Sequence, residues 1–368
     1  MFNRFKLYLK NFDWIILAAV LLLVTFGLVE IYSVALGQGS LDLLNFKKQL
    51  VFAGVGFGLL FCFAFIDSYF LKSLSRYFYI IGLIVLIAVL IFGETIRGTK
   101  GWFSVANLNL QPVEFVKIIL ILFLANFFSN LATKIKTTRH FLSSALSAFL
   151  LIAMVLLQPD FGSALILGII WLIMIIAAGF DKKYFIIVGL TVIIVFVVSW
   201  FLLFKDYQKE RIMTFLSPQA NSLESGYNIS QAIIAVGSGG FIGQGVGFGS
   251  QSQLKFLPEA QNDFIFAVIA EELGFLGVVL VLSFYFIFFF RSFKILHRVN
   301  NDFGIYFIIG AGGLIFIQMF INIGMNLGIM PVVGLPLPFI SYGGSSLLSL
   351  LILVGIIENI IIKSKISY

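Results

Sequence analysis

Long runs of hydrophobic residues alternate with short polar segments along almost the whole chain. Runs of about 20 apolar residues have the length that an α-helix needs to cross a bilayer. Ten such runs lie roughly at 13–33, 49–67, 77–93, 113–131, 141–157, 161–179, 184–204, 264–290, 305–327 and 343–363. The pattern predicts an all-α polytopic membrane protein with about ten transmembrane helices, forming one domain over residues 1–368, with both termini on the same side.

Composition supports a surface that is solvated by lipid. Charged residues make up 11% of the 368 residues, whereas soluble domains carry about 25%. The net charge of +7 does not indicate nucleic-acid binding, because the basic residues are scattered through short connections between the apolar runs. A single cysteine, Cys62, excludes an intramolecular disulfide and disfavours a thiol-ligated metal site. The first apolar stretch lacks a following cleavage site, so we expect an uncleaved insertion signal.

The distribution of Lys and Arg predicts the orientation in the membrane. Fifteen of these residues lie at the N-terminus and in every second connection after it, whereas the alternate short connections hold only Lys47, Lys48, Arg97 and Lys100. The positive-inside rule therefore places both termini in the cytoplasm. Four connections then lie outside, at 94–112, 158–160, 205–263 and 328–342. Because long loops are usually functional, the working face is expected to be extracytoplasmic, with 205–263 as its largest loop.

Ionisable residues at the edges of membrane helices are functional candidates, because a charge costs about 2.5–3.5 kcal/mol at mid-bilayer. Asp263 opens the eighth predicted helix after a proline-containing loop, where partial desolvation would favour a general base. Glu114 and Lys117 are three residues apart and within ion-pair reach, so they either neutralise each other between helices or serve a site. Asp160 lies at the outer mouth, where it can cap the sixth helix, contribute to a site, or do both.

Three more carboxylates lie near predicted outer helix ends. Glu30 is close to the end of the first helix, where its side chain is expected to snorkel to water. Glu271 and Glu272 point about 100° apart on a helix, so only one of them is expected to face any single site.

Basic residues and a glycine run in the predicted outer connections are further candidates for a binding site. Lys100, Arg211 and Lys255, with Lys117 at the rim, can pair with a pyrophosphate. The glycine run 237–249 matches neither a GxGxxG nor a Walker motif, so a flexible or closely packed loop is expected there.

Histidine chemistry is excluded from the outer face. The two histidines, His140 and His297, lie in cytoplasmic connections, so an outer Ser-His triad or a His-ligated metal cannot form. The remaining outer carboxylates, basic residues and hydroxyls suit carboxylate-assisted transfer from a phosphate leaving group.

Five ordered motifs resemble the SEDS family (shape, elongation, division and sporulation), whose members are peptidoglycan glycosyltransferases. The motifs lie at 98–102, 111–117, 158–163, 226–274 and 330–346. Segments 251–258 and 333–338 are more similar to the elongation branch than to the division branch. The resemblance implies polymerisation of lipid II into β-1,4 glycan strands at the outer face of the bacterial cytoplasmic membrane. It also implies a class B penicillin-binding protein as partner.

The resemblance also implies roles for individual residues. Asp263 matches the family's essential aspartate and would deprotonate the acceptor 4-hydroxyl. Glu114 and Lys117 match paired residues that shape the cavity or hold the pyrophosphate. The remaining substrate-binding candidates are Lys100, Arg211 and Lys255, and the supporting candidates are Asp160, Glu271 and Ser341. No metal is assigned, although a divalent cation, Mg²⁺ or Mn²⁺, at Asp160 or Asp263 stays open.

Departures from the family pattern and competing functions remain. Asn262 stands where the family often has Thr, and Gly101 replaces the basic residue beside Trp102, which weakens any role for Lys100. The alternatives are a lipid II flippase, a scaffold that recruits a penicillin-binding protein, and a paralogue serving division or sporulation. A flippase would line a path through the bilayer with charge, whereas the polar residues here concentrate at the outer face.

Overall fold

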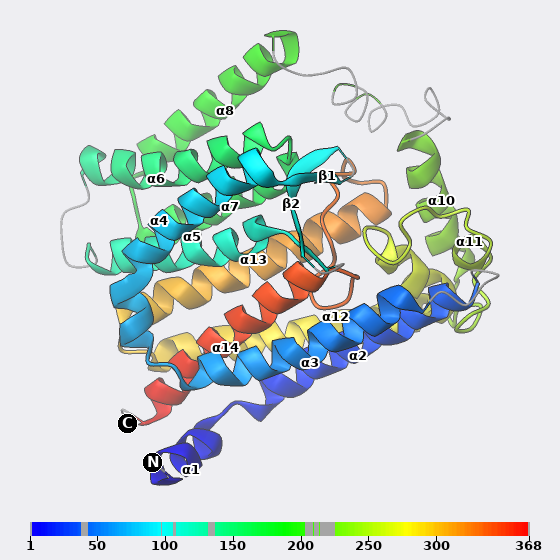
Figure 1. Cartoon of the computed structure of the whole chain (residues 1–368), viewed down its shortest axis with the longest axis horizontal. Coiled ribbons are helices and arrows are strands. Elements are labelled where there is room, and N and C mark those ends of the chain that lie inside the picture. Colours follow the sequence, from blue (N-terminus) through cyan, green and yellow to red (C-terminus); the bar gives the residue numbers. More distant parts are fainter. Residues whose placement is uncertain are drawn as a thin grey trace.

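The computed structural model describes residues 2–37, 43–96, 98–105, 108–131, 137–202, 209, 213 and 225–366. Long helices dominate it (Figure 1), and all ten predicted helices are present. They are α2 (Trp14–Leu36), α3 (Leu44–Phe65), α4 (Ser68–Phe92), α5 (Pro112–Ser129), α6 (Thr138–Leu157), α7 (Phe161–Ala178), α8 (Lys182–Leu202), α12 (Ile265–Lys294), α13 (Asp302–Asn326) and α14 (Gly344–Ile366). Within the described ranges, nine helices qualify as spans by length and composition, and α8 covers the tenth prediction.

The last helix, α14, forms the centre of the bundle. In its most apolar window 94% of the residues are buried, compared with 28% for α4. Small residues allow α14 to approach α3 closely: a Cβ at Gly355 would lie 2.4 Å from the Leu60 carbonyl oxygen. By contrast, α8 lies at the margin of the bundle in Figure 1.

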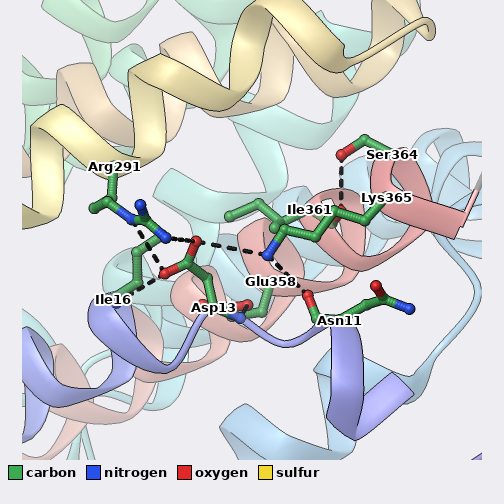
Figure 2. Close-up of polar contacts among 8 residues, drawn as sticks. All are labelled: Asn11, Asp13, Ile16, Arg291, Glu358, Ile361, Ser364 and Lys365. Atoms are coloured by element: carbon green, nitrogen blue, oxygen red, sulfur yellow. Dashed lines mark hydrogen bonds and ion pairs between the residues drawn. The ribbon is translucent and has the colours of Figure 1, made fainter. Parts of the chain in front are cut away.

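Polar contacts fasten both termini to the same end of the bundle (Figure 2). Arg291, at the end of α12, donates to the buried Asp13 carboxylate at 2.8 Å, and Lys365 of α14 lies 3.7 Å from it. The Asp13 amide donates to the Glu358 carboxylate at 3.0 Å. Both termini therefore lie on one side, as the even number of spans predicts, and the cytoplasmic location of that side stays a prediction.

Some elements were not foreseen from hydropathy. The connection 94–110 forms a small antiparallel sheet in the order β1 (Glu94–Ile96), β2 (Thr99–Val105) and β3 (Leu108–Leu110). Short helices also appear, namely α1 (Phe2–Asn11), α10 (Ser225–Ser238), α11 (Ser250–Gln253) and the 3-10 turn η1 (Ile295–Arg298). The strands β1 and β3 have three residues each, which is too short for a period-2 pattern to stand out.

The glycine run packs against a break in α12. Gly274 has φ 64° and ψ −162° inside this helix, so the helical hydrogen bonds are interrupted there. Backbone groups of the run replace them: the amides of Phe275 and Leu276 donate to the carbonyls of Gly240 and Phe241 at 3.0 and 3.2 Å. Of the two alternatives for the run, the closely packed loop is therefore the one observed.

Candidate functional site

A cavity of about 310 Å³ opens where the four predicted outer connections meet. Side chains from the sheet, the start of α5, the 158–160 turn, the segment before α12 and the loop before α14 line it together. The lining residues are Lys48, Phe52, Ile96, Thr99, Trp102, Asn109, Gln111, Glu114, Asp160, Asn262, Asp263, Val333, Gly334, Pro336, Tyr342, Gly343, Gly344, Ser345 and Ser346. The convergence places three predicted carboxylates around one space.

Asp263 lies two residues before α12, and its backbone is held firmly. The Nδ2 groups of Asn322 and Asn326, one turn apart on α13, each donate to its carbonyl oxygen at 3.0 Å. The N-cap of α12 is Phe264, so Asp263 does not cap this helix. Gly334 lies opposite the carboxylate, since a Cβ there would be 3.6 Å from Asp263 Oδ2. The half-buried side chain is therefore presented to the cavity from a fixed backbone.

Glu114 reaches the cavity from the first turn of α5, which begins with Pro112 at a position where a missing N–H is tolerated. Its Oε1 accepts from Lys117 Nζ at 2.7 Å, and the Lys117 side chain is fully buried. The predicted ion pair is thus confirmed. Lys117 lies behind the wall rather than on it, because only Glu114 of the pair lines the cavity. The lysine neutralises a buried carboxylate that would otherwise be unfavourable.

Asp160 both caps a helix and lines the cavity. Its Oδ1 accepts from the Ser163 amide at 2.9 Å at the start of α7, as an N-cap does. Its Oδ2 accepts from Gln111 Nε2 at 3.2 Å, which links α7 to the start of α5. The predicted helix cap is therefore confirmed, and the contribution of Asp160 to a functional site stays a prediction.

Ser341 ties the last outer loop to the segment that carries Asp263. Its hydroxyl donates to the Asn262 carbonyl at 2.6 Å and accepts from the Leu337 amide at 2.8 Å. Nearby, the Tyr342 amide donates to the Gln261 carbonyl at 2.8 Å. Ser341 is buried and does not line the cavity, so its contribution is to position the neighbouring backbone.

Among the described residues, Lys100, Lys255 and Glu271 do not line the cavity. Lys100 Nζ lies 3.4 Å from the Ile91 carbonyl, and Lys255 is exposed in the turn after α11. Glu271 accepts from the backbone amides of Gln251 and Ser252 at 2.7 and 3.1 Å, and so anchors a loop. Arg211 lies outside the described residues. Substrate contact by Lys100, Arg211 and Lys255 stays a prediction.

Two expectations about carboxylates are wrong. Glu30 does not snorkel: it is fully buried, because α12 and the loop 239–253 cover the outer part of α2. Glu271 and Glu272 do not face separate surroundings, because the loop wraps around the end of the helix. Ser252 donates to both, through its amide to Glu271 at 3.1 Å and through its hydroxyl to Glu272 at 3.3 Å.

Sequence reasoning missed Lys48, which lines the cavity from the start of α3. It was one of four basic residues in the alternate short connections, and this rarity was an available signal. Trp102 and Tyr342 also line the cavity and offer apolar surface beside the carboxylates. The cavity thus combines three carboxylates, one lysine and aromatic walls, a set suited to proton abstraction beside an anionic ligand.

Comparisons with known proteins identify one family over nearly the whole chain. The model of the FtsW, RodA and SpoVE family, described as cell cycle protein, matches residues 13–366. "Peptidoglycan glycosyltransferase MrdB" of Escherichia coli is 36% identical over 95% of this chain and 93% of its own length. "Stage V sporulation protein E" of Bacillus subtilis is 37% identical over 95% of this chain and 96% of its own length.

Solved structures share the fold over almost the full length. A chain from a study of structural coordination of polymerization and crosslinking by a peptidoglycan synthase complex has a TM-score of 0.80 at 29% identity, covering 96% of this chain and 98% of that one. The rod shape determining protein RodA of Thermus thermophilus has a TM-score of 0.71 at 28% identity, covering 95% and 96%.

Proposed function

The chain belongs to the SEDS family of FtsW, RodA and SpoVE, and from this premise we propose that it polymerises lipid II in the cavity around Asp263. Within that family it is a multi-pass bacterial membrane protein and a peptidoglycan glycosyltransferase. The proposal adds the substrate, the outer face of the cytoplasmic membrane and the catalytic group. The observation that carries it is the convergence of all four predicted outer connections on one cavity with three carboxylates.

The reaction joins two lipid-linked sugars. The Asp263 carboxylate takes the proton from the 4-hydroxyl of the acceptor sugar, and the resulting oxygen attacks C1 of the donor. The bond between C1 and the pyrophosphate oxygen breaks, and the lipid pyrophosphate leaves with the bonding electron pair. A β-1,4 bond forms, and the proton on Asp263 is released to water.

The surroundings of Asp263 support the role of base. Two asparagine side chains fix its backbone, so the carboxylate is presented with little conformational freedom. Glu114 contacts Lys117, and Asp160 contacts Ser163 and Gln111, so these two carboxylates help to hold the wall of the cavity in place. Lys48 is the basic side chain on the described wall and is placed to attract the donor pyrophosphate.

A divalent cation, Mg²⁺ or Mn²⁺, would assist the departure of the pyrophosphate. Among the described residues, no three of His, Cys, Asp and Glu come together to hold a metal ion. Mg²⁺ is commonly held by one or two carboxylates together with substrate phosphates, and Asp160 and Asp263 both face the cavity. The cation would therefore enter with the substrate, and chelation is expected to lower polymer formation without unfolding the chain.

We also propose a partner protein and the cellular process that the chain serves. A class B penicillin-binding protein would cross-link the strands that the chain produces, consistent with the similarity to a chain of a peptidoglycan synthase complex. Service in elongation is supported by segments 251–258 and 333–338. Relatives named MrdB, FtsW and stage V sporulation protein E match about equally well. Restoring rod shape to cells that lack their elongation polymerase, but not division to cells that lack FtsW, would support a role in elongation.

A reconstitution experiment distinguishes a glycosyltransferase from a lipid II flippase. The chain, purified with its partner and reconstituted in vesicles, receives lipid II, and glycan polymer and lipid II transport are measured in the same preparation. We expect polymer from the wild type and none from Asp263→Ala. Equal polymer from both chains would refute Asp263 as the base, and transport without polymer from either would favour a flippase.

A further inference from the structure

A second cavity, of about 350 Å³, lies at the end of the bundle that holds both termini. The start of α4, the segment between η1 and α13, and the last turns of α14 line it together. It shares no described lining residue with the cavity around Asp263, so the two sites are separate. Small-molecule sites usually have volumes of about 300–1,000 Å³, and this cavity lies within that range.

Two lysines from different helices line this second cavity. Lys72 reaches it from near the start of α4, and Lys363 from the last turn of α14. Lys363 donates to Asp67 and, at 3.1 Å, to the Ser68 hydroxyl. In the described part of the chain, the partly buried Lys72 side chain has no ion pair and no hydrogen bond. Asp67 and Asp302 flank the cavity in sequence but do not line it, so its described wall carries positive charge only.

Other groups on the wall also favour an anion. Two helices begin at the cavity, since Ser68 is the first residue of α4 and Asn301 is the N-cap of α13. The N-terminus of a helix carries a partial positive charge that attracts anions. The Ser68 hydroxyl accepts from Lys363, which leaves its own hydrogen for donation. Asn301 caps α13 through its side-chain oxygen, which accepts from the Phe303 amide at 3.1 Å, so its side-chain nitrogen remains a donor.

The surroundings of the cavity favour a lipid over a soluble anion. Tyr69 lines the cavity and is 77% exposed, and tyrosine is enriched at the level of the lipid headgroups. Ile80 and Ile87 are exposed on the same face of α4 as Tyr69, because their spacing corresponds to whole helical turns. A lipid whose phosphate occupies the cavity can therefore lay its acyl chains along an apolar face of α4.

We propose that this cavity binds the headgroup phosphate of an anionic phospholipid. Lys72 and Lys363 pair with the phosphate oxygens, and the Ser68 hydroxyl donates to one of them. Basic pockets between membrane helices bind anionic headgroups in this way. The bound lipid joins α4, whose most apolar window is 28% buried, to the central helix α14. It thereby stabilises the packing of a peripheral helix on the core of the bundle.

Native mass spectrometry of the full chain in mild detergent tests the proposal. The chain is titrated with phosphatidylglycerol or with phosphatidylcholine of the same acyl chains, and the dissociation constant of the first bound lipid is measured. Phosphatidylglycerol should bind about 10-fold more tightly, because its headgroup carries a net negative charge. Equal affinities of the two lipids would overturn the proposal. Glycerol 3-phosphate at the same concentration should not displace phosphatidylglycerol, and full displacement would assign the cavity to a soluble phosphate compound and overturn the lipid.

Variants locate the binding site. Lys72→Gln should weaken phosphatidylglycerol binding about 10-fold, and Lys363→Gln should have a similar effect. Folding should tolerate Lys72→Gln, because this side chain has no partner to lose among the described residues. Lys72→Arg keeps the charge and should bind as the wild type does. Lys294→Gln is the matched control, since it removes the same charge from an exposed residue at the end of α12. Wild-type affinity in Lys72→Gln, or an equal loss in Lys294→Gln, would overturn the proposal.

Discussion

The position of Asp263 depends on side chains that belong to another helix. Asn322 of α13 donates both to the Asp263 carbonyl at 3.0 Å and to the Leu335 carbonyl at 2.8 Å, so it joins the two outer segments that flank the carboxylate. Gln318 lies one turn earlier on the same helix and is also buried, but its amide atoms have no partner in the described part of the chain. These two residues form a natural comparison.

Replacing each of them by Leu should have different effects on stability. Asn322→Leu removes two donors from buried carbonyl oxygens and should lower the free energy of unfolding by about 1–2 kcal/mol. Gln318→Leu removes an unsatisfied amide and should leave stability unchanged or raise it. The midpoint of thermal unfolding in detergent measures both. An equal loss of stability in the two variants would contradict the positioning role of Asn322.

The sequence predicts the charged residues of the site better than the residues that hold them. Asp263, Glu114 and Asp160 stand out because a charge at a helix edge is rare in an apolar chain. Asn322 gives no such signal, since a neutral amide within a membrane helix can pair in many ways. Glu30 was misjudged because exposure of a helix end depends on what covers it, and the covering loop is more than 200 positions away in the sequence.

At the level of elements, the loop 239–253 and the break in α12 form one structure. Gly243 has φ +80°, and a Cβ there would lie 2.2 Å from the Glu272 carbonyl oxygen. The amides of Gln244 and Gly245 donate to the carbonyls of Glu271 and Glu272 at 3.0 and 2.9 Å. The loop thereby satisfies carbonyl groups at the end of the first half of α12, which need partners in a lipid environment.

Gly243→Ala should therefore undock the loop. The added methyl group collides with backbone that cannot move aside cheaply, and the positive φ adds strain. Gly237→Ala is the matched control, because this residue of α10 has no atom within 4 Å of an added Cβ. Limited proteolysis of the loop should become faster in Gly243→Ala and stay at the wild-type rate in Gly237→Ala. Unchanged proteolysis in Gly243→Ala would contradict the packing described here.

Hydropathy predicts the long helices because each helix must bury a continuous apolar surface or expose it to the lipid of the bilayer. It does not predict the break at Gly274, because a single glycine in an apolar run is compatible with an unbroken helix. It also does not predict the sheet β1–β3, whose hydrogen bonds form between short segments of mixed polarity. These are the two features that shape the loops around the cavity and beside α12.

At the scale of the whole molecule, the two ends of the bundle differ in charge and in construction. Asp13, Arg291 and Lys365 close the end that holds both termini (Figure 2), whereas the catalytic cavity lies among the predicted outer connections. The positive-inside rule assigns the first end to the cytoplasm. The proposed reaction requires this orientation, because glycan strands are built outside the membrane.

Cysteine labelling tests the orientation. In a Cys62→Ser background, Lys255→Cys should react with a membrane-impermeant maleimide in intact spheroplasts. Lys183→Cys, at a residue whose side chain is 62% exposed, should react only after the membrane is permeabilised. The reverse pattern would place the cavity on the cytoplasmic side and would contradict the proposed function.

The most direct measurement of the central claim compares the rate of glycan polymerisation with the affinity for lipid II in Asp263→Asn. Asparagine preserves the shape of the side chain, but its neutral amide cannot act as a base as a carboxylate does. The rate should fall by about 10²–10⁴-fold while lipid II still binds with wild-type affinity. Asp181→Asn, which changes an exposed carboxylate that does not line the cavity, should retain the wild-type rate. A wild-type polymerisation rate in Asp263→Asn would contradict the account.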